Sequence, residues 1–362
     1  MKKIDTYILI GPEPSNNKKN NPGGQLTASI GLKNYAEQNN IHLKIIDTLQ
    51  TSFPIPSFKV RLISGLNRIQ YLFKILLKMK IKGVIIFAGS GFSFYERILA
   101  SFICKIFDVR TILFIRDGFF KDKVKSSQLY YFLVKIMLKI PDFIGSQGIG
   151  WTKFYQSIGL NSQKIVLIRN WMTEQYNDNF IFKKISKDET IRFIFVGWLV
   201  KEKGLNELLN SIKDLSEKYN FHFTFVGGGN MEKFVREYAE KNKLKNIEST
   251  GWINNFVVKE QLLKAHIFVL PSYSEGFPNA LIESMSFGLP SICSNVGAIS
   301  DSVIDGLNGY LIEPKNENSL KIAMENYILN PEEVFQHSIE TINILKENHD
   351  WEKNCKKMFD IF

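Results

Sequence analysis

Short apolar runs alternate along the chain with longer segments in which apolar residues recur at helical spacing. The runs that we expect to be strands in the first half are TYILIG, HLKIID, GVIIFAG, TILFIRDG, DFIGSQG and KIVLIRN. Those in the second half are IRFIFVGW, FHFTFVGGG, NIESTGWI, HIFVLPSY, PSICSNVG and NGYLIEP. Continuously apolar strands that alternate with helices are typical of parallel sheets covered by helices on both faces.

Two such series of similar length predict an α/β protein with two doubly wound domains, which agrees with a length of 362 residues. The segment 171–190 is polar and lacks periodicity, so we place a linker there, between a domain at 1–170 and a domain at 191–340. The last residues, HDWEKNCKKMFDIF, are amphipathic. They predict a terminal helix at 341–362 that crosses toward the first domain. In open α/β sheets ligands bind beyond the carboxyl ends of the strands, so the functional residues are expected in the loops that follow them.

Charge is distributed unevenly. Residues 1–186 hold 27 lysines and arginines against 11 acidic residues, a net charge of +16, whereas the remainder carries −6. This asymmetry indicates either an anionic partner for the first half or a basic surface without a specific partner.

Part of the basic excess lies in residues 58–82, which contain seven basic residues and no acidic one. The apolar residues of this segment recur at helical spacing, at Leu62, Leu66, Ile69, Phe73 and Leu76. One interpretation is an amphipathic helix that rests on an anionic membrane surface. The other is that the apolar stripe packs on the sheet while the lysines are solvated.

The three cysteines, Cys104, Cys293 and Cys355, are widely spaced and suggest neither a metal site nor a disulfide framework, which fits a reducing cytoplasm. The first residues do not resemble a signal peptide, because Asp5 interrupts the start and the apolar run that follows is short. The chain has no stretch of about 18 or more apolar, uncharged residues, and Lys135 and Lys139 interrupt the apolar segment YYFLVKIMLKI, so we expect no membrane-spanning helix. The expected location is the cytoplasm, with peripheral binding at the inner face of the plasma membrane.

The segment SEGFPNALIESMSFG carries two glutamates around a tight turn. Glu275 is a loop residue at the end of a strand, Pro278 suits the first turn of the helix that follows, and Glu283 projects from about its second turn. A helix start offers unpaired N–H groups and a partial positive charge, which favour an anion. Carboxylates accept hydrogen bonds from hydroxyls, so the ligand that fits is a nucleotide sugar, with a diphosphate between two polyols. Alternatively, Glu283 is a solvated helix residue and Glu275 only complements the helix dipole.

The stretch SEGFPNALIESMSFGLPSICSNVGAISDSVIDGLNGYLIEP resembles the Glu-x7-Glu region of retaining glycosyltransferase family 4. Further motifs follow in the order of that family: NPGGQLTASIGL, FIFVGWLVKEKGLNELLNSI, FTFVGGGNMEKF, STGWI and LPSYSEGFP. The resemblance covers most of the chain. It implies the GT-B fold, in which two Rossmann-like domains face each other across a cleft, and sugar transfer with retention at the anomeric carbon. It also implies a role in bacterial polysaccharide assembly, such as O antigen of lipopolysaccharide, capsule or exopolysaccharide, with a glycan or lipid-linked acceptor.

The resemblance further implies a role for each matching residue. Glu283 would bind the ribose hydroxyls, Glu275 the hydroxyls of the transferred sugar, and Lys203 a phosphate. The backbone N–H groups that would face the sugar and diphosphate belong to Gly276, Phe277, Asn279 and Ala280. In the first domain, Gly23 and Gly24 would let a loop approach the phosphate or the acceptor.

Two positions depart from the pattern of the family. Trp198 stands where an Arg that contacts the diphosphate is common. The segment FIRDGFF places Arg116 and Asp117 where a His-Gly pair is common, and all five histidines lie elsewhere. Arg116 supplies charge or a hydrogen bond but cannot act as a base at neutral pH. No Asp-x-Asp is present, so Lys203 and the helix start are expected to stabilise the leaving diphosphate without a metal or other cofactor.

Two other classes of protein remain. A dinucleotide-dependent oxidoreductase would place Gly-x-Gly-x-x-Gly after the first strand, but the glycines there are Gly11, Gly23 and Gly24. A non-catalytic nucleotide-sugar-binding subunit is suggested by Trp198 and the missing His, and release of free nucleoside diphosphate would exclude it. Nucleic acid is not an expected partner.

Overall fold

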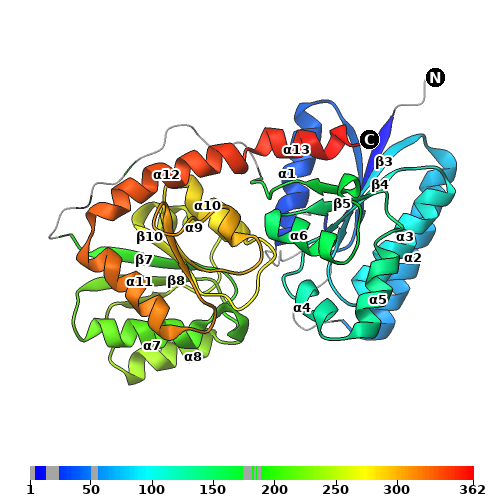
Figure 1. The fold of residues 1–362 in the computed structure, drawn as a ribbon. Coiled ribbons are helices and arrows are strands. Elements are labelled where there is room, and N and C mark those ends of the chain that lie inside the picture. Colours follow the sequence, from blue (N-terminus) through cyan, green and yellow to red (C-terminus); the bar gives the residue numbers. More distant parts are fainter. Residues whose placement is uncertain (1–4, 14–23, 50–55, 174–181, 183–184, 186–188) are drawn as a thin grey trace. The chain divides into compact units, whose positions relative to one another are not determined.

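The computed structural model describes residues 5–13, 24–49, 56–173, 182, 185 and 189–362. The chain divides into two units, each built around its own parallel sheet (Figure 1). Unit 1 comprises Met1–Gln175 and Asp350–Phe362, and unit 2 comprises Tyr176–His349. Most of the expected linker at 171–190 lies outside the described residues.

The sheet of unit 1 has six parallel strands in the order β2-β1-β3-β4-β5-β6. Its central strands are buried along nearly their whole length, which is why they read as uninterrupted apolar runs. The six runs predicted in the first half correspond to β1 (Thr6–Gly11), β2 (His42–Asp47), β3 (Ile81–Ala88), β4 (Thr111–Ile115), β5 (Phe143–Ser146) and β6 (Ile165–Leu167).

The helices of unit 1 are α1 (Gly24–Gln38), α2 (Phe58–Lys78), α3 (Phe92–Ile106), α4 (Phe120–Lys125), α5 (Gln128–Met137), α6 (Ile149–Ser157) and α13 (Trp351–Asp360). The connection from β1 to β2 runs one way across the sheet, and the next four connections run the other way. Because parallel crossovers are right-handed, α1 covers one face while α2, α3 and the α4–α5 segment cover the opposite face.

Helix α13 packs beside α1 on the first of these faces (Figure 1). The Trp351 Nε1–H donates to the Gly31 carbonyl at 3.1 Å, and Phe359 stacks on Tyr35 with ring centroids 5.8 Å apart. The buried residues of α13 are Trp351, Cys355, Met358 and Phe359, which follow the amphipathic spacing of the sequence. The last residues of the chain therefore complete the core of unit 1.

Within the part of the chain that the structure describes, no helix combines the length and hydropathy needed to cross a membrane.

The sheet of unit 2 also has six parallel strands, in the order β12-β11-β10-β7-β8-β9. Its strands are β7 (Ile191–Val196), β8 (Phe221–Val226), β9 (Ile247–Ser249), β10 (Ile267–Leu270), β11 (Ser291–Ser294) and β12 (Gly309–Ile312). The order reverses between β7 and β10, and the loops after these two strands form a ligand-binding point in doubly wound sheets. The prediction of an α/β protein with two doubly wound domains is confirmed.

The helices of unit 2 are α7 (Leu205–Ser216), α8 (Glu232–Lys241), α9 (Asn255–Lys264), α10 (Asn279–Ser286), α11 (Glu317–Leu329) and α12 (Glu332–Asn348), with the short 3-10 helix η2 (Lys201–Lys203). Helices α10 and α12 pack together, and α7 packs on α11. The segment expected as a terminal helix at 341–362 contains the end of α12 and all of α13, separated at His349 and Asp350.

Candidate active site

The loops after β7 and β10 meet at the point where the sheet of unit 2 reverses its order. Gly204, directly after η2, has φ +70°, and a Cβ at this position would lie 2.1 Å from the Pro271 carbonyl oxygen. Glycine therefore permits a contact between the two loops that no other residue would allow. The Tyr273 N–H donates to the Glu202 carbonyl at 2.8 Å and ties the loops together.

This contact brings two of the predicted site residues together. The Lys203 ammonium forms an ion pair with Glu275 Oε1, and the Ser272 hydroxyl donates to the same oxygen at 2.8 Å. The two side chains are only 22% and 12% exposed. A cation and a carboxylate thus stand together, partly shielded from water, at the carboxyl end of β10.

Helix α10 begins four residues after Glu275. Pro278 occupies the N-cap position, so Asn279 and Ala280 present their N–H groups in the first turn, where the helix dipole is positive. Lys203 and this helix start together place positive potential beside the Glu275 carboxylate. The turn predicted from Glu275 to Pro278, followed by a helix, is confirmed.

The turn is supported from the loop that follows β11. The Ala298 N–H donates to the Gly276 carbonyl at 3.0 Å. Gly297 has φ +65°, and a Cβ there would lie 2.2 Å from the Glu275 carbonyl oxygen. Phe277 is buried, with its ring centroid 4.8 Å from that of His349. The backbone of the turn is therefore held on both sides.

Glu283 lies in the second turn of α10 and is partly buried. Burial raises the pKa of its carboxyl group, and the nearby Lys259 of α9 lowers it to a smaller extent. Among the residues that the structure describes, Lys259 is a charged neighbour of this carboxylate, and each carboxylate oxygen can accept more than one hydrogen bond. The carboxylate can therefore accept hydrogen bonds from the hydroxyls of a ligand.

Trp198, the residue found in place of the expected arginine, packs edge-to-face against Trp252 with centroids 4.8 Å apart. Trp252 also lies close to the glycine turn after β8, since a Cβ on Gly228 would lie 2.5 Å from its Nε1 atom. In the triple glycine at 227–229, Gly227 and Gly229 have positive φ, a backbone conformation that favours glycine. The pair of tryptophans forms an aromatic wall at the ends of β7 and β9.

The other predicted site residues belong to unit 1. The Arg116 guanidinium lies between 5.2 and 5.5 Å from the ring centroids of Phe87, Phe114 and Trp171. Its Nη2 donates to the Gly24 carbonyl at 3.4 Å, at the start of α1. Burial lowers the pKa of Arg116 to about 9. Arg116 and Gly24 are therefore neighbours, while Gly23 lies outside the described residues.

Some residues at the site were not identified from the sequence. Ser272 lies within the LPSYSEGFP motif, and its spacing of three residues from Glu275 was the available indication. Tyr273, which donates to the Glu207 carboxylate at 2.8 Å, fixes the loop to α7. No local sequence pattern indicates the contact of Gly297 with the turn, because the contact depends on a left-handed backbone in a neighbouring loop. Within the described ranges, no group of three or more His, Cys, Asp or Glu side chains is arranged to hold a metal ion.

Comparison with known proteins places these features in a family. The model of the family described as glycosyl transferases group 1 matches residues 177–358. An uncharacterized glycosyltransferase of Methanocaldococcus jannaschii is 29% identical over 242 residues, covering 61% of this chain and 68% of the relative. An uncharacterized 41.2 kDa protein in the cps region of Klebsiella pneumoniae is 24% identical over 333 residues, covering 90% and 84%.

Solved structures share the fold over the whole chain. The apo form of the lipopolysaccharide outer core galactosyltransferase WaaB has a TM-score of 0.71 at 18% identity, covering 99% of this chain and 100% of that one. Anabaena HepE in complex with UDP and glucose has a TM-score of 0.70 at 13% identity, covering 99% of both chains.

Proposed function

Because the chain belongs to the glycosyl transferases group 1 family, we propose that it moves a sugar from a nucleotide-diphosphate sugar to a glycan or lipid-linked acceptor. The chain is a glycosyltransferase, and the identity of the donor and acceptor is the proposal. Its proposed role is the assembly of a bacterial surface polysaccharide: O antigen, capsule or exopolysaccharide. The occurrence of a relative in a cps region supports this role, and the UDP and glucose bound to HepE support a nucleotide sugar as donor.

The ion pair of Lys203 and Glu275 beside the start of α10 is the observation that carries the proposal. When the bond between the anomeric carbon and the diphosphate breaks, negative charge grows on the leaving diphosphate. An ammonium group and helix N–H groups stabilise that charge because they are already oriented toward it. In this proposal Lys203 and the N–H groups of Gly276, Phe277, Asn279 and Ala280 hold the diphosphate, and the reaction needs no metal.

The carboxylates of Glu283 and Glu275 bind different parts of the donor in this proposal. Glu283, whose carboxylate is partly buried near Lys259, binds the ribose hydroxyls. Glu275, directly at the turn, binds hydroxyls of the transferred sugar. Trp198 and Trp252 line the donor side with an aromatic wall. Arg116 supplies a partly buried positive charge in unit 1, and transfer proceeds with retention at the anomeric carbon.

The test is a coupled assay of nucleoside diphosphate release, with a panel of UDP- and GDP-sugars and a lipid-linked glycan acceptor. We expect release that depends on both substrates and persists in EDTA, and a product whose anomeric proton coupling matches that of the donor. Glu275→Gln should reduce turnover strongly while UDP or GDP affinity stays near that of the wild type. Donor binding without any release would instead identify a non-catalytic binding subunit, and wild-type turnover of Glu275→Gln would remove Glu275 from the site.

The location that we propose is the cytoplasmic face of the plasma membrane, with unit 1 bound peripherally to anionic lipid. The basic excess of residues 1–186 supports an anionic surface as partner.

A further inference from the structure

Helix α2 exposes a line of large apolar side chains. Leu62, Leu66, Phe73 and Leu77 are 39% to 62% exposed and recur at spacings of four and seven residues, so they share one side of the helix. A different set, including Leu72, Ile75 and Leu76, is buried against the unit. The stripe expected from the sequence therefore faces water over most of its length, and only its last member, Leu76, packs inward.

Helix α3 repeats this arrangement. Its exposed residues are Tyr95, Leu99, Phe102 and Ile106, which follow the spacing i, i+4, i+7 and i+11 and are 41% to 66% exposed. The opposite side of α3 is buried. One helix can expose a few apolar residues without consequence, but two neighbouring helices with the same stripe form a continuous surface.

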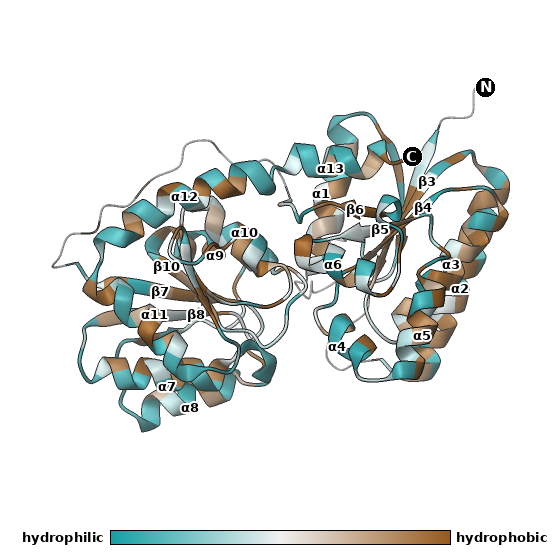
Figure 2. Ribbon diagram, in the orientation of Figure 1, coloured by the Kyte–Doolittle hydropathy of each residue, from teal (hydrophilic) through white to brown (hydrophobic). Residues whose placement is uncertain are grey.

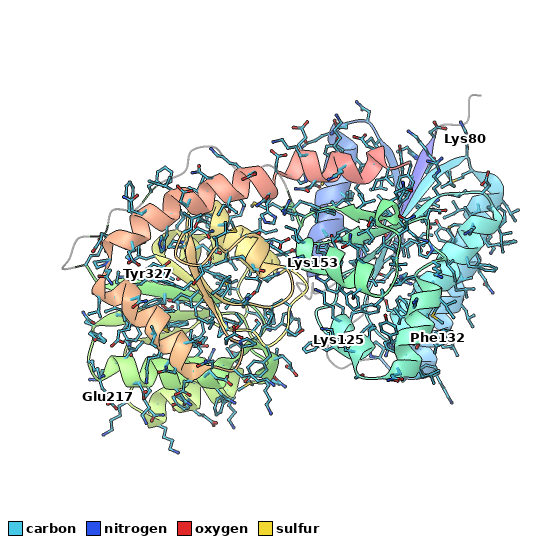
Figure 3. All side chains as sticks on the ribbon, viewed as in Figure 1. Lys80, Lys125, Phe132, Lys153, Glu217 and Tyr327 are labelled. Atoms are coloured by element: carbon cyan, nitrogen blue, oxygen red, sulfur yellow. The ribbon has the colours of Figure 1, made fainter. Side chains whose placement is uncertain are left out.

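Helix α5 adds a third stripe. Leu129, Phe132, Leu133 and Ile136 are 36% to 69% exposed and again lie on one side of their helix. Phe132 is labelled in Figure 3. Figure 2 shows hydrophobic residues along α2, α3 and α5. We call these three stripes together the three-helix apolar face.

The topology makes the three stripes neighbours. Helices α2, α3 and α5 belong to successive crossovers that run in the same direction, so they lie on the same face of the sheet. Arg68 of α2 forms two hydrogen bonds of 2.8 Å with the Glu96 carboxylate of α3. Rings of the two helices also meet, with the centroids of Phe58 and Phe92 5.7 Å apart.

The charges on these helices are almost all positive. The three helices contain eight lysines and arginines and a single acidic residue, Glu96. Glu96 is buried and paired with Arg68 and Arg97, so its charge does not reach the surface. The exposed lysines include Lys59, Lys74 and Lys78 on α2 and Lys105 on α3.

We propose that the three-helix apolar face is a membrane-docking surface that inserts its apolar side chains among the headgroups of an anionic phospholipid bilayer. A surface that combines apolar stripes with lysines and lacks exposed acids is complementary to a negatively charged interface. The lysines draw the protein to the bilayer, and burial of the apolar stripes then holds it by a force that salt does not screen. The proposal rests on the proposed function only for its purpose, which is to bring the active site to a lipid-linked acceptor.

The experiment uses the full chain and vesicles of phosphatidylglycerol and phosphatidylcholine in equal parts, with vesicles of phosphatidylcholine alone for comparison. One variant removes apolar side chains (Leu66→Ser, Leu77→Ser, Ile106→Ser), and a second reverses charge (Lys74→Glu, Lys78→Glu, Lys105→Glu). A matched control makes the same chemical changes at exposed residues of unit 2 (Leu263→Ser, Leu329→Ser, Ile322→Ser). Sedimentation is measured at low salt and at about 1 M salt, where the Debye length is about 3 Å.

We expect the wild type and the control to bind anionic vesicles and to keep part of that binding in high salt. The apolar variant should lose the salt-resistant part, and the charge variant should bind at least tenfold more weakly at low salt. Equal binding by the apolar variant and the wild type, or no sedimentation of the wild type, overturns the proposal. If the wild type fails to bind vesicles but forms an oligomer that the apolar variant abolishes, the face is a protein interface.

A second measurement does not depend on the folding of a triple variant. All three native cysteines are buried, so a single cysteine at Leu77 or Leu329 can be labelled selectively with an environment-sensitive dye. Emission should shift to the blue on anionic vesicles for the label at 77 and stay unchanged at 329. No shift at 77 overturns the proposal. Nucleotide binding and turnover with a water-soluble acceptor are recorded in parallel, since their loss would count against the proposed function and leave vesicle binding unaffected.

Discussion

Lys203→Ala should weaken the binding of a nucleoside diphosphate more than any change to the aromatic wall at Trp198. Lys203 has one described partner, Glu275, and its ammonium has three N–H donors. It can therefore hold a phosphate oxygen while it remains paired with the carboxylate. Trp198 has no charge and packs on Trp252, so Trp198→Phe removes little that a diphosphate would contact.

The magnitude follows from the burial of the pair. A hydrogen bond to a charged group contributes about 1.5–3 kcal/mol, which corresponds to roughly 10- to 150-fold in Kd. The 22% exposure of Lys203 allows water to screen part of this, so we expect an increase of about tenfold. In the free protein, loss of the ammonium leaves Glu275 partly buried with Ser272 as its remaining described partner. We expect this to reduce the free energy of unfolding by about 1–2 kcal/mol, between the values for exposed and buried ion pairs.

The assay is titration calorimetry with UDP and with GDP, together with chemical denaturation of the free protein. Lys201→Ala is the matched control, because Lys201 lies in the same short helix η2 but is exposed and has no described partner. The double variant Lys203→Ala, Glu275→Gln should be destabilised by less than the sum of the single variants, because the neutral amide no longer leaves a buried charge.

Two results would refute this reasoning. If Lys203→Ala binds both nucleotides as tightly as Lys201→Ala does, the phosphate is held by other groups, and Arg116, Arg169 and the N–H groups of α10 become the candidates. If the effects of Lys203 and Glu275 on unfolding are simply additive, the ion pair has no energetic role in the free protein.

Three further predictions concern the same unit. Glu283→Gln should lower nucleotide affinity yet raise the unfolding temperature at pH 7. Burial raises the pKa of Glu283 above its unfolded value of about 4.3, so the ionised carboxylate destabilises the folded protein at neutral pH. The difference in unfolding temperature between the variant and the wild type should therefore vanish at about pH 4 or below. An equal difference at both pH values would contradict the assignment of this cost to the carboxylate. Gly297→Ala should destabilise the protein and weaken donor binding, since its Cβ would meet the Glu275 carbonyl at 2.2 Å. Gly306 is the control, because it has a similar φ of +70° and open space around it. Gly306→Ala should therefore cost only the strain of a left-handed backbone, about 1–2 kcal/mol. Similar unfolding temperatures for Gly297→Ala and Gly306→Ala would argue against the close contact of Gly297 with the Glu275 carbonyl. Trp198→Arg should fold and bind UDP or GDP at least as tightly as the wild type, and weaker binding by calorimetry would show that the indole itself contacts the ligand.

Much of the fold could be predicted because it depends on local pattern. Strands buried on both faces must be apolar throughout, so runs such as GVIIFAG and IRFIFVGW identify β3 and β7 directly. The sequence also predicts the short strand β9. The predicted run at 246–253 is longer than the strand Ile247–Ser249, because the residues after the strand do not show where its hydrogen bonds end. The sequence predicts the turn at Glu275–Pro278 equally well, since glycine and proline favour particular turn conformations.

The partners of the site residues could not be read in the same way. Lys203 and Glu275 are separated by 72 positions, and their pairing depends on the approach of Gly204 to Pro271 across two strands. The sequence shows that Trp198 departs from the family pattern, but its packing on Trp252 depends on the adjacency of the ends of β7, β8 and β9.

The sequence alone determined the parallel strands, the two doubly wound sheets and the glutamates around the turn. Strands buried on both faces need consecutive apolar residues, and tight turns need glycine and proline, so both are visible in neighbouring positions of the sequence. The tertiary structure decided which side of α2 faces water. The apolar residues of this helix suit either a sheet or a membrane. The right-handed crossover places α2 on one face of the sheet, with Leu72, Ile75 and Leu76 directed inward. Leu62, Leu66 and Phe73 remain exposed. A helix with apolar residues on more than one side has no preferred orientation of its own, so only packing against the rest of the chain selects one.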